Sequence, residues 1–363
     1  MRILEELTVR NFKSIRQQTL RLGRMNVFIG GNGSGKSNLV GVFRFLNQVV
    51  QEQLQTYTGT AGGADNILYF GRKRSPSLEL AVNFAQGSNA NGYRIELLPT
   101  EDDRFVFKDE LIYYHDRSRY TFPYRIGLGG GHAESKLPGS KENVAGYVRS
   151  DLGSYRIYHF HDTSPGAKVK QTGDLEDNRY LREDASNLAA FLYRLQEKHP
   201  DTFSNIAGTV RQVAPFFDSF HLEPSRLNPD KIRLEWKEQG NDRYFNAHAL
   251  SDGTLRFICL TTLLLQPDVP PVILLDEPEL GLHPGAIELL AALFSSAAER
   301  TQIMAATQSV TLVNQLTPEV VWAVDRVEGE SVFRDLAKED LSGWLDGYAL
   351  GDLWEKNVVG ARP

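Results

Sequence analysis

Apolar positions near the N-terminus follow two different periods on either side of a glycine-rich segment. Before this segment, LEELTVRNFKSI and LRLGRMNVFIG have the pattern of two strands, and the second contains an apolar run over residues 25–29. After it, apolar residues recur at spacings of three, one and three, which is the period of a helix. These residues are Leu39, Val42, Phe43 and Leu46. The pattern predicts a strand, a glycine loop and a helix in that order.

The middle of the chain changes from short alternating segments to helical ones. Apolar and polar residues alternate in LELAVNF, GYRIELL and RFVFKDELIYY, and turn residues separate these segments. The pattern predicts an antiparallel sheet. Residues 127–142 have the glycine-rich composition of a mobile surface loop. Two helices are predicted in SNLAAFLYRLQEKHP and DTFSNIAGTVRQV, and a half-buried strand follows in KIRLEWKE.

The C-terminal part alternates strongly apolar strands with helices. An apolar helix is predicted in ALSDGTLRFICLTTLLL, and QIMAATQS and EVVWAVDRV have the pattern of strands. PVILLDEPE begins with a continuous apolar run, which is typical of a strand buried on both faces. The crossover helix expected in GAIELLAALFSSAAE predicts a largely parallel sheet, and therefore an α/β fold.

These changes of pattern divide the 363 residues into four parts of one large domain. The parts are 1–56 with the glycine loop, 57–175 with the antiparallel sheet and an insert, 176–249 with a helical lobe, and 250–363 with the buried strands and a tail. No internal repeat and no sustained heptad occurs, so long coiled-coil arms are not expected.

Composition favours a cytoplasmic protein without a membrane partner. No segment approaches the roughly 20 apolar residues of a membrane helix, and MRILEELTVRNF has charges where a signal peptide needs apolar residues. Cys259 is the only cysteine, and its apolar surroundings predict a buried small hydrophobe rather than a nucleophile.

The formal net charge of −6 provides no global attraction for nucleic acid, so DNA binding would need a local patch. GRKRSP and DRSRY are the two candidates, and a solvated loop is the simpler interpretation of each. Their basic residues are Arg72, Lys73, Arg74, Arg117 and Arg119.

The glycine loop has the spacing of a P-loop, with four residues between Gly30 and Gly35, which are followed by Lys36 and Ser37. In such a loop the glycines let backbone N–H groups converge on phosphates, and the following helix directs its positive end at them. Lys36 would reach the β and γ oxygens, and Ser37 would bind Mg²⁺. The alternative is a tight turn without a ligand, which the strand–loop–helix context disfavours.

Asp276 and Glu277 end the buried strand that is predicted in VILLDEPE. In that place Asp276 would hold Mg²⁺, directly or through water, and Glu277 would activate the attacking water. A mere strand exit into solvent is the alternative. The turn LSDGT at residues 250–254 precedes the next apolar helix, and either Ser251 or Asp252 would serve as an ordinary N-cap there.

The chain resembles the ABC-type ATPase heads of the RecF, structural-maintenance-of-chromosomes (SMC) and OLD families. The resemblance rests on five segments in this order: NFKSI, GGNGSGKSNL, LSDGTLRF, LLDEPELGLHP and ATQS. The chain is most similar to the arm-less bacterial AAA-type relatives of these families. The resemblance is clear over residues 1–50 and 245–325 and vague between them. It implies a P-loop fold of ABC type, with ATP held between two heads and hydrolysis separating them.

The resemblance also implies roles for individual residues. ATP-binding residues would be Gly30, Asn32, Gly33, Ser34, Gly35, Lys36, Ser37 and Asn38 from one subunit, with Ser251 and Gly253 reaching the γ-phosphate bound by the other. Ser37 and Asp276 would hold Mg²⁺. The catalytic residues would be Glu277, Lys36 and Gln308, and residues 280–283 would be a D-loop that faces the partner.

The chain departs from the pattern of the family at several positions. Asp252 stands between the serine and glycine of the signature, and Gln308 stands where a switch histidine is common. Glutamine can donate a hydrogen bond but carries no charge, so slow hydrolysis is expected. The Q-loop glutamine has no clear counterpart, because HFHDTSP offers Asp162 instead. A zinc site at His159 and His161 is less persuasive than two structural or phosphate-facing histidines.

Two C-terminal features have alternative interpretations. VDRVEGES is similar to the start of a Toprim nuclease domain, but only about thirty residues follow, too few for a typical domain. A hairpin turn at Glu328-Gly329 is the preferred interpretation. The aromatic and aliphatic residues of the tail, from Trp344 to Trp354, predict docking onto the protein's own core, with a partner-binding face as the alternative.

Two functions remain open from the sequence. The first is an Mg-ATP-dependent ATPase that dimerises head to head and acts on DNA in repair or in defence against invading DNA. The second is an ATP-gated module that regulates a separately encoded effector such as a nuclease or toxin. A transporter motor subunit is disfavoured, because about 200 residues of mixed sheet and helix separate the P-loop from the signature turn.

Overall fold

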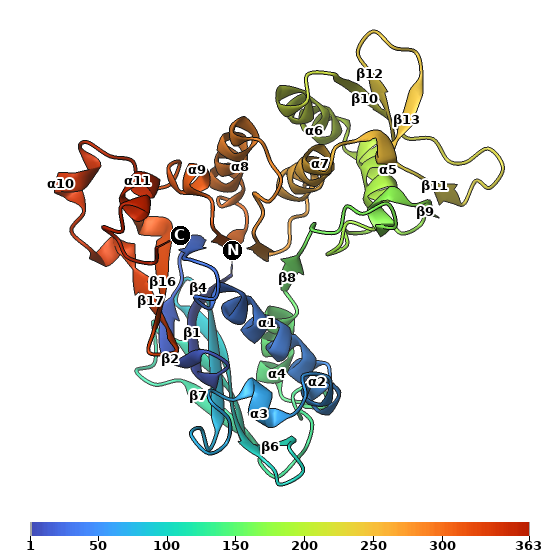
Figure 1. Cartoon of the computed structure of the whole chain (residues 1–363). Coiled ribbons are helices and arrows are strands. Elements are labelled where there is room, and N and C mark those ends of the chain that lie inside the picture. The colour runs from blue at the N-terminus through green and yellow to red at the C-terminus, as the bar shows by residue number, and fades with distance from the viewer. Residues whose placement is uncertain (1, 363) are drawn as a thin grey trace.

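A sheet of mostly parallel strands forms the centre of the molecule, as the computed structural model of residues 2–362 shows (Figure 1). In spatial order its strands are β17 (Glu330–Asp335), β16 (Val321–Val327), β3 (Met25–Ile29), β15 (Gln302–Thr307), β14 (Val272–Asp276) and β8 (Tyr155–Tyr158). Only β16 and β17 are antiparallel neighbours. They are joined at Glu328 and Gly329, both with positive φ, so the predicted hairpin turn is confirmed.

This central sheet is buried on both faces. Along β3, Phe28 packs into a core shared with helix α1 (Lys36–Val50), while Val27 and Ile29 pack into a second core on the other face. The second core contains α7 (Asp252–Leu265) and α8 (Pro284–Ala297). Because both faces are covered, the inner strands β3, β14 and β15 consist mostly of apolar residues, as their sequences predicted.

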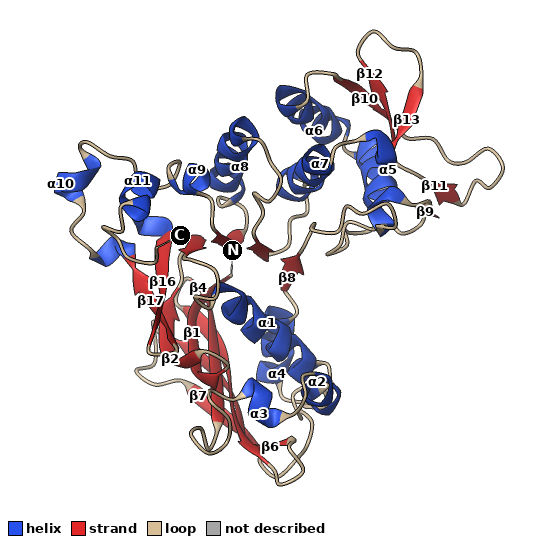
Figure 2. Ribbon diagram, viewed as in Figure 1, coloured by secondary structure: helices blue, strands red, loops and turns tan. Residues whose placement is uncertain are grey.

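A second sheet is antiparallel and lies beside α1 (Figure 2). In spatial order its strands are β2 (Ile15–Arg21), β1 (Ile3–Phe12), β4 (Leu78–Gln86), β5 (Asn89–Pro99), β6 (Phe105–Asp116) and β7 (Tyr124–Gly129). The neighbouring helices are α2 (Leu54–Thr60), α3 (Ala64–Ile67) and α4 (Asn143–Leu152). The antiparallel sheet predicted in the middle of the chain is present, and it also includes β1 and β2 from the N-terminal part.

The segment expected to be a mobile surface loop is held by specific contacts. The Glu134 carboxylate accepts hydrogen bonds of 2.9 Å from the N–H groups of Leu54 and Gln55, at the start of α2. Leu137 is fully buried in the core beneath the antiparallel sheet. The first N–H groups of a helix lack internal partners, so a carboxylate from the loop satisfies them and fixes the loop in place.

A helical lobe lies on one side of the central sheet (Figures 1 and 2). It contains α5 (Leu188–Lys198), α6 (Pro200–Val213), the small sheet of β10 (Phe217–His221), β12 (Glu235–Glu238) and β13 (Tyr244–Asn246), and the pair β9 (Gly173–Asp174) and β11 (Lys231–Ile232). The single strand expected in KIRLEWKE is therefore wrong. It is divided into β11 and β12, because the chain changes its pairing partner between Ile232 and Glu235.

The C-terminal tail contains the short helices α10 (Ser342–Leu345) and α11 (Leu350–Glu355), and α9 (Val310–Val313) lies earlier in the chain, after β15. Leu353 and Trp354 are fully buried, whereas Trp344 and Tyr348 are 48% and 44% exposed. Only α11 docks onto the core of the protein.

Two further expectations concern burial and membranes. Cys259 is buried, as predicted, and burial raises the pKa of its thiol. Among the helices of residues 2–362, none combines the length and the apolar character that crossing a bilayer requires.

Candidate nucleotide-binding site

The loop between β3 and α1 presents unpaired backbone donors at a helix N-terminus. The N–H groups of Gly35, Lys36 and Ser37 make no hydrogen bond within residues 2–362, and no side chain caps α1. Unpaired amides and the positive end of the helix macrodipole together favour an anion. The loop therefore has the geometry of a phosphate cradle, as its sequence predicted.

Two glycines of this loop are required by close contacts. A Cβ on Gly35, whose φ is +115°, would lie 2.0 Å from the Ser331 hydroxyl oxygen. A Cβ on Gly30 would lie 2.4 Å from the carbonyl oxygen of Val324. The backbone of the loop is thus pressed against β16 and β17, where no side chain fits.

Lys36 is 5% exposed, and its ammonium group is held by the loop itself. Its Nζ donates hydrogen bonds to the carbonyl oxygens of Gly30 at 2.5 Å and Gly31 at 3.1 Å. Burial lowers the pKa of Lys36, and nearby carboxylates, Glu277 first, oppose that shift. The lysine is therefore positioned in the loop, with its charge next to the site where phosphates would lie.

The loop opens into a cavity of about 180 Å³ that also contains residues from three other parts of the chain. Its lining residues are Asn32, Gly33, Ser34, Gly35, Lys36, Ser37, Asn38, Glu277, Gln308 and Arg326. The structure thus places the predicted catalytic residues Glu277 and Gln308 beside the P-loop. Asp276 lies with Glu277 and His161 at an adjoining hollow.

The two acidic residues at the end of β14 are partly buried, and the backbone of Glu277 is strained. Burial and then the Glu277 charge raise the pKa of Asp276. Glu277 has a φ of +45°, and its N–H donates to the Ala306 carbonyl at 2.8 Å. Gln308 donates a short hydrogen bond from Nε2 to the Glu277 carboxylate. A left-handed backbone at a non-glycine residue is uncommon, and at Glu277 it occurs beside the P-loop.

Glu279 is a site residue that the sequence analysis missed. Its Oε1 accepts hydrogen bonds from the Thr307 hydroxyl at 2.6 Å and from the Gln308 N–H at 2.9 Å, while its Oε2 is buried without a partner within residues 2–362. Burial raises the pKa of Glu279. The residue holds the backbone of Gln308, and its position two residues after Glu277 was the available signal.

A group of small polar residues behind the loop was also missed. The Ser331 hydroxyl donates to the Ser34 carbonyl at 2.5 Å and lies 2.6 Å from the Ser14 hydroxyl. Asn38, predicted to bind nucleotide, donates from Nδ2 to the same Ser14 oxygen at 2.6 Å. These bonds connect the P-loop to β17 and to the turn between β1 and β2.

The predicted signature turn lies at the start of α7 and lines no part of the phosphate cavity. The Ser251 hydroxyl accepts the Thr254 N–H at 3.1 Å and so caps the helix. A Cβ on Gly253 would lie 2.3 Å from the Gly281 carbonyl. Arg256 donates to the carbonyl of Leu280 at 2.9 Å, so the turn and the predicted D-loop form one unit. A single chain does not bring Ser251 and Gly253 to its own P-loop.

Comparison with family models relates this arrangement to known proteins. The model described as "AAA domain, putative AbiEii toxin, Type IV TA system" matches residues 25–314, which include both the P-loop and the acids of β14. The chain belongs to this AAA-domain family. No curated protein matches the chain significantly.

Solved structures show which form of the AAA-domain family's fold is present. An SmcHead bound to the C-winged helix domain of ScpA has a TM-score of 0.62 and 15% identity over 92% of this chain and 98% of that chain. An Smc head with an extended coiled coil bound to the C-terminal domain of ScpA, derived from Pyrococcus furiosus, has a TM-score of 0.59 and 16% identity, over 95% and 99%. The AAA domain therefore has the fold of an Smc head, which is the type of fold that its motifs predicted.

The donor set of the AAA domain fits ATP and Mg²⁺. The free amides and Lys36 suit phosphate oxygens, and the exposed Ser37 hydroxyl and the Asp276 carboxylate are oxygen ligands of the kind Mg²⁺ prefers. Zinc has no comparable set, because no group of three or more His, Cys, Asp or Glu residues lies together in the described part of the chain. His161 instead lies at the hollow that contains Asp276.

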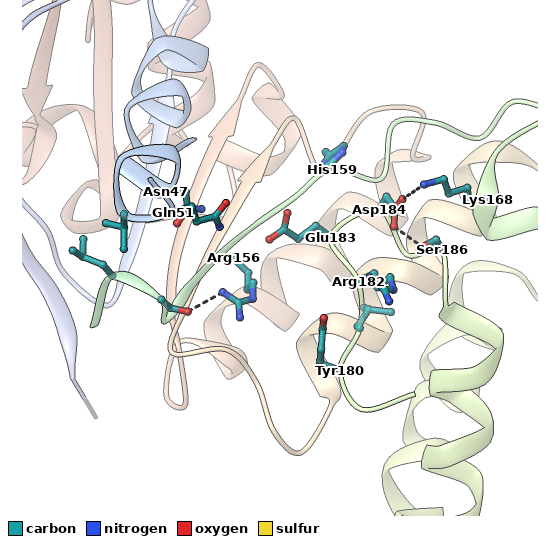
Figure 3. A pocket seen from close by; sticks show the side chains of 14 residues that line it. Asn47, Gln51, Arg156, His159, Lys168, Tyr180, Arg182, Glu183, Asp184 and Ser186 are labelled. Carbon is teal, nitrogen blue, oxygen red and sulfur yellow. Dashed lines mark hydrogen bonds and ion pairs between the residues drawn. The ribbon is translucent and has the colours of Figure 1, made fainter. Parts of the chain in front are cut away.

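A larger hollow of the AAA domain lies elsewhere (Figure 3). It has a volume of about 730 Å³ between the end of α1, β8 and residues 180–186, and contains no P-loop residue. Its charges include Arg156, Glu183 and the pair Lys168–Asp184 at 3.8 Å. This groove has neither a convergent set of donors nor the acids of β14, so its size alone does not indicate the nucleotide site.

Three of the five basic residues considered for DNA, Arg72, Arg117 and Arg119, form ion pairs with acids. Arg72 forms ion pairs with Asp65 at 2.9 Å and with Asp103. Arg117 forms an ion pair with Glu5 at 2.5 Å. Such pairing removes much of the attraction that each segment would have for a phosphate backbone.

Proposed function

We propose that the protein is a cytoplasmic Mg²⁺-dependent ATPase whose heads associate when ATP is bound. The observation that supports this most strongly is the convergence of Lys36, Glu277 and Gln308 on one cavity at the uncapped start of α1. A phosphate chain placed there meets donors on one side and the carboxylate of Glu277 on the other.

Each residue has a separate task in the proposed reaction. Lys36 exchanges its bonds to the Gly30 and Gly31 carbonyls for bonds to β and γ oxygens, and Ser37 with Asp276 holds Mg²⁺. Glu277 accepts the proton of the attacking water once Gln308 moves its amide from that carboxylate to the γ-phosphate. The neutral amide of Gln308 stabilises developing negative charge less than a cation does, so turnover is slow.

The proposed association follows from the separation of the two halves of the site. Ser251 and Gly253 lie outside the phosphate cavity of their own chain and are exposed or half-exposed. A second head in the opposite orientation would place them on the γ-phosphate of the first. Two ATP molecules would then lie between the heads, and their hydrolysis would allow separation.

We propose defence against foreign DNA as the biological setting, with DNA repair as the other setting that the motifs imply. The family description, which names a toxin and a toxin–antitoxin system, supports the first. An ATP-gated regulator of a separately encoded effector is the second candidate. It is favoured by the ion pairing of Arg72 and Arg117 and by the exposed Trp344 and Tyr348, which suit a protein partner better than DNA.

The deciding experiment measures mass in solution by light scattering for the Glu277→Gln protein with and without Mg-ATP. We expect a change from 40.8 kDa to about twice that mass only with ATP, and ATP turnover lowered by about 100-fold or more. Glu288→Gln, on the exposed face of α8, is the matched control and keeps normal turnover. An unchanged mass with bound ATP would contradict ATP-driven association, and unchanged turnover would contradict the role of Glu277.

A further inference from the structure

Arg326 is a cation of the phosphate cavity that belongs to none of the motifs. It lies at the end of β16 and lines the cavity together with Glu277 and Gln308. Its Nη1 donates to the Gly33 carbonyl at 3.3 Å, a long bond that leaves most of the guanidinium free. Within residues 2–362, no carboxylate pairs with this exposed side chain.

The acid next to Arg326 in the sequence is directed elsewhere. Asp325 accepts hydrogen bonds from Arg334 at 3.1 Å and from the Ala361 N–H at 2.6 Å. Successive residues of a strand point to opposite faces, so Asp325 faces the tail while Arg326 faces the P-loop. The positive charge of Arg326 is therefore not neutralised by its neighbour.

The position of Arg326 relative to the P-loop is set by strand pairing. β16 runs parallel to β3, with Ala323 opposite Ile29, the last residue before the loop. Across the hairpin Arg326 is opposite Ser331, whose hydroxyl bonds to the Ser34 carbonyl at 2.5 Å. The strand paired with the one that carries the guanidinium is thus bonded to the loop, which limits relative movement.

Besides Lys36 and the proposed Mg²⁺, Arg326 offers the cavity one more positive charge for a nucleoside triphosphate. Lys36 lies close to three carboxylates, Asp276, Glu277 and Glu279, and a nucleoside triphosphate adds further negative charge. Guanidinium groups bind phosphate oxygens with strong charge-assisted hydrogen bonds. Glu277 and Gln308, which are proposed to act at the terminal phosphate, line the same cavity as Arg326.

We infer that Arg326 binds the terminal phosphate of a nucleoside triphosphate from the side of Gly33, within the same subunit, and so favours ATP over ADP. The inference rests on the proposed nucleotide site. It adds to that site a residue from the hairpin of β16 and β17, which no motif includes.

The test measures the affinity of Mg-ATP and Mg-ADP by titration calorimetry for full-length Arg326→Ala and Arg326→Lys, both carrying Glu277→Gln to prevent turnover. We expect Arg326→Ala to bind ATP about 10- to 100-fold more weakly, with a smaller change for ADP. Arg326→Lys, which keeps the charge, recovers part of the loss. The dependence of ATP affinity on salt becomes shallower in the alanine variant.

Two control variants separate the possible outcomes. Arg24 lies at the opposite end of β3 and is also an exposed arginine with one long hydrogen bond, to the Glu299 carbonyl at 3.4 Å. We expect Arg24→Ala to leave ATP affinity unchanged. If Lys36→Ala no longer binds ATP while Arg326→Ala binds it as tightly as Arg24→Ala does, the role of Arg326 is overturned but the proposed site stands. If Lys36→Ala also binds normally, the proposed site itself fails. An equal loss of ATP and ADP together with a lower melting temperature without nucleotide would mean that Arg326 only supports the loop, which also overturns the inference.

Discussion

The N-termini of α1 and α7 carry the two halves of the proposed site. The backbone N–H groups at these two helix starts are satisfied in opposite ways. At α1 no side chain caps the helix, and the amides of Gly35, Lys36 and Ser37 are free. At α7 the Ser251 hydroxyl accepts the Thr254 N–H, and the turn is exposed. One end is open to an anion, whereas the other is already satisfied by its own serine.

The difference shows how each helix start is stabilised without a ligand. An uncapped helix start in a left-handed conformation is unfavourable by itself, and at α1 the contacts of Ser331 and Ser14 behind the loop support it. The α7 turn needs no such support, because its cap is local. We expect changes at α1 to affect nucleotide binding directly and changes at α7 to affect association alone.

The largest effect is expected from Gly35→Ala. The left-handed φ and the contact with Ser331 together should lower the free energy of unfolding by about 3 kcal/mol, as measured by urea denaturation. Gly33→Ala is the matched control, since Gly33 has a φ of +77° but nothing within 4 Å of a Cβ. It should cost only the backbone strain, about 1 kcal/mol. Equal losses would mean that β17 does not support the loop.

Lys36→Ala is next in size and tests the open end of the comparison. Loss of its charge-assisted bonds to phosphate should weaken ATP binding about 100-fold in calorimetry. Lys198→Ala, in the exposed last turn of α5, is the control and should bind ATP normally. Normal binding by the Lys36 variant would remove the basis for calling the loop a nucleotide site.

Ser251→Ala tests the capped end. Loss of the cap should lower stability by about 1 kcal/mol. The affinity of the single head for ATP should stay unchanged, while the doubling of mass with Mg-ATP in the Glu277→Gln background should disappear. A loss of ATP affinity in the monomer would contradict the separation of the two helix ends.

The smallest effect concerns pH and Glu279. Because burial raises the pKa of Glu279 above 4.5, the folded protein binds this proton more tightly than the unfolded chain. The free energy of unfolding should therefore fall as pH rises from about 4.5 through the raised pKa. Glu279→Gln keeps an acceptor for Thr307 and Gln308 and should flatten this slope in urea titrations. A slope as steep as in the parent would assign the effect to the other acids whose pKa burial raises, Asp151 and Asp276.

Sequence spacing predicted the residues whose geometry is local. The P-loop, the acids after the apolar run of β14 and the turn at Glu328-Gly329 each depend on neighbours within a few residues, where backbone preference and periodicity decide the outcome. The same local rules predicted the loop at residues 127–142 but not the bonds of Glu134 that attach it to α2. They also predicted one strand in KIRLEWKE, where the different pairing partners of β11 and β12 divide the segment.

By itself, then, the sequence determined the type of fold and the phosphate cradle, with Lys36, Asp276 and Glu277 at their places. Only the tertiary structure decided what surrounds the cradle. Arg326 and Gly33 are 293 residues apart, and Ser331 and Ser34 are 297 residues apart. No local period connects such pairs, because their contact depends on which strands lie side by side in the sheet, here β16 beside β3.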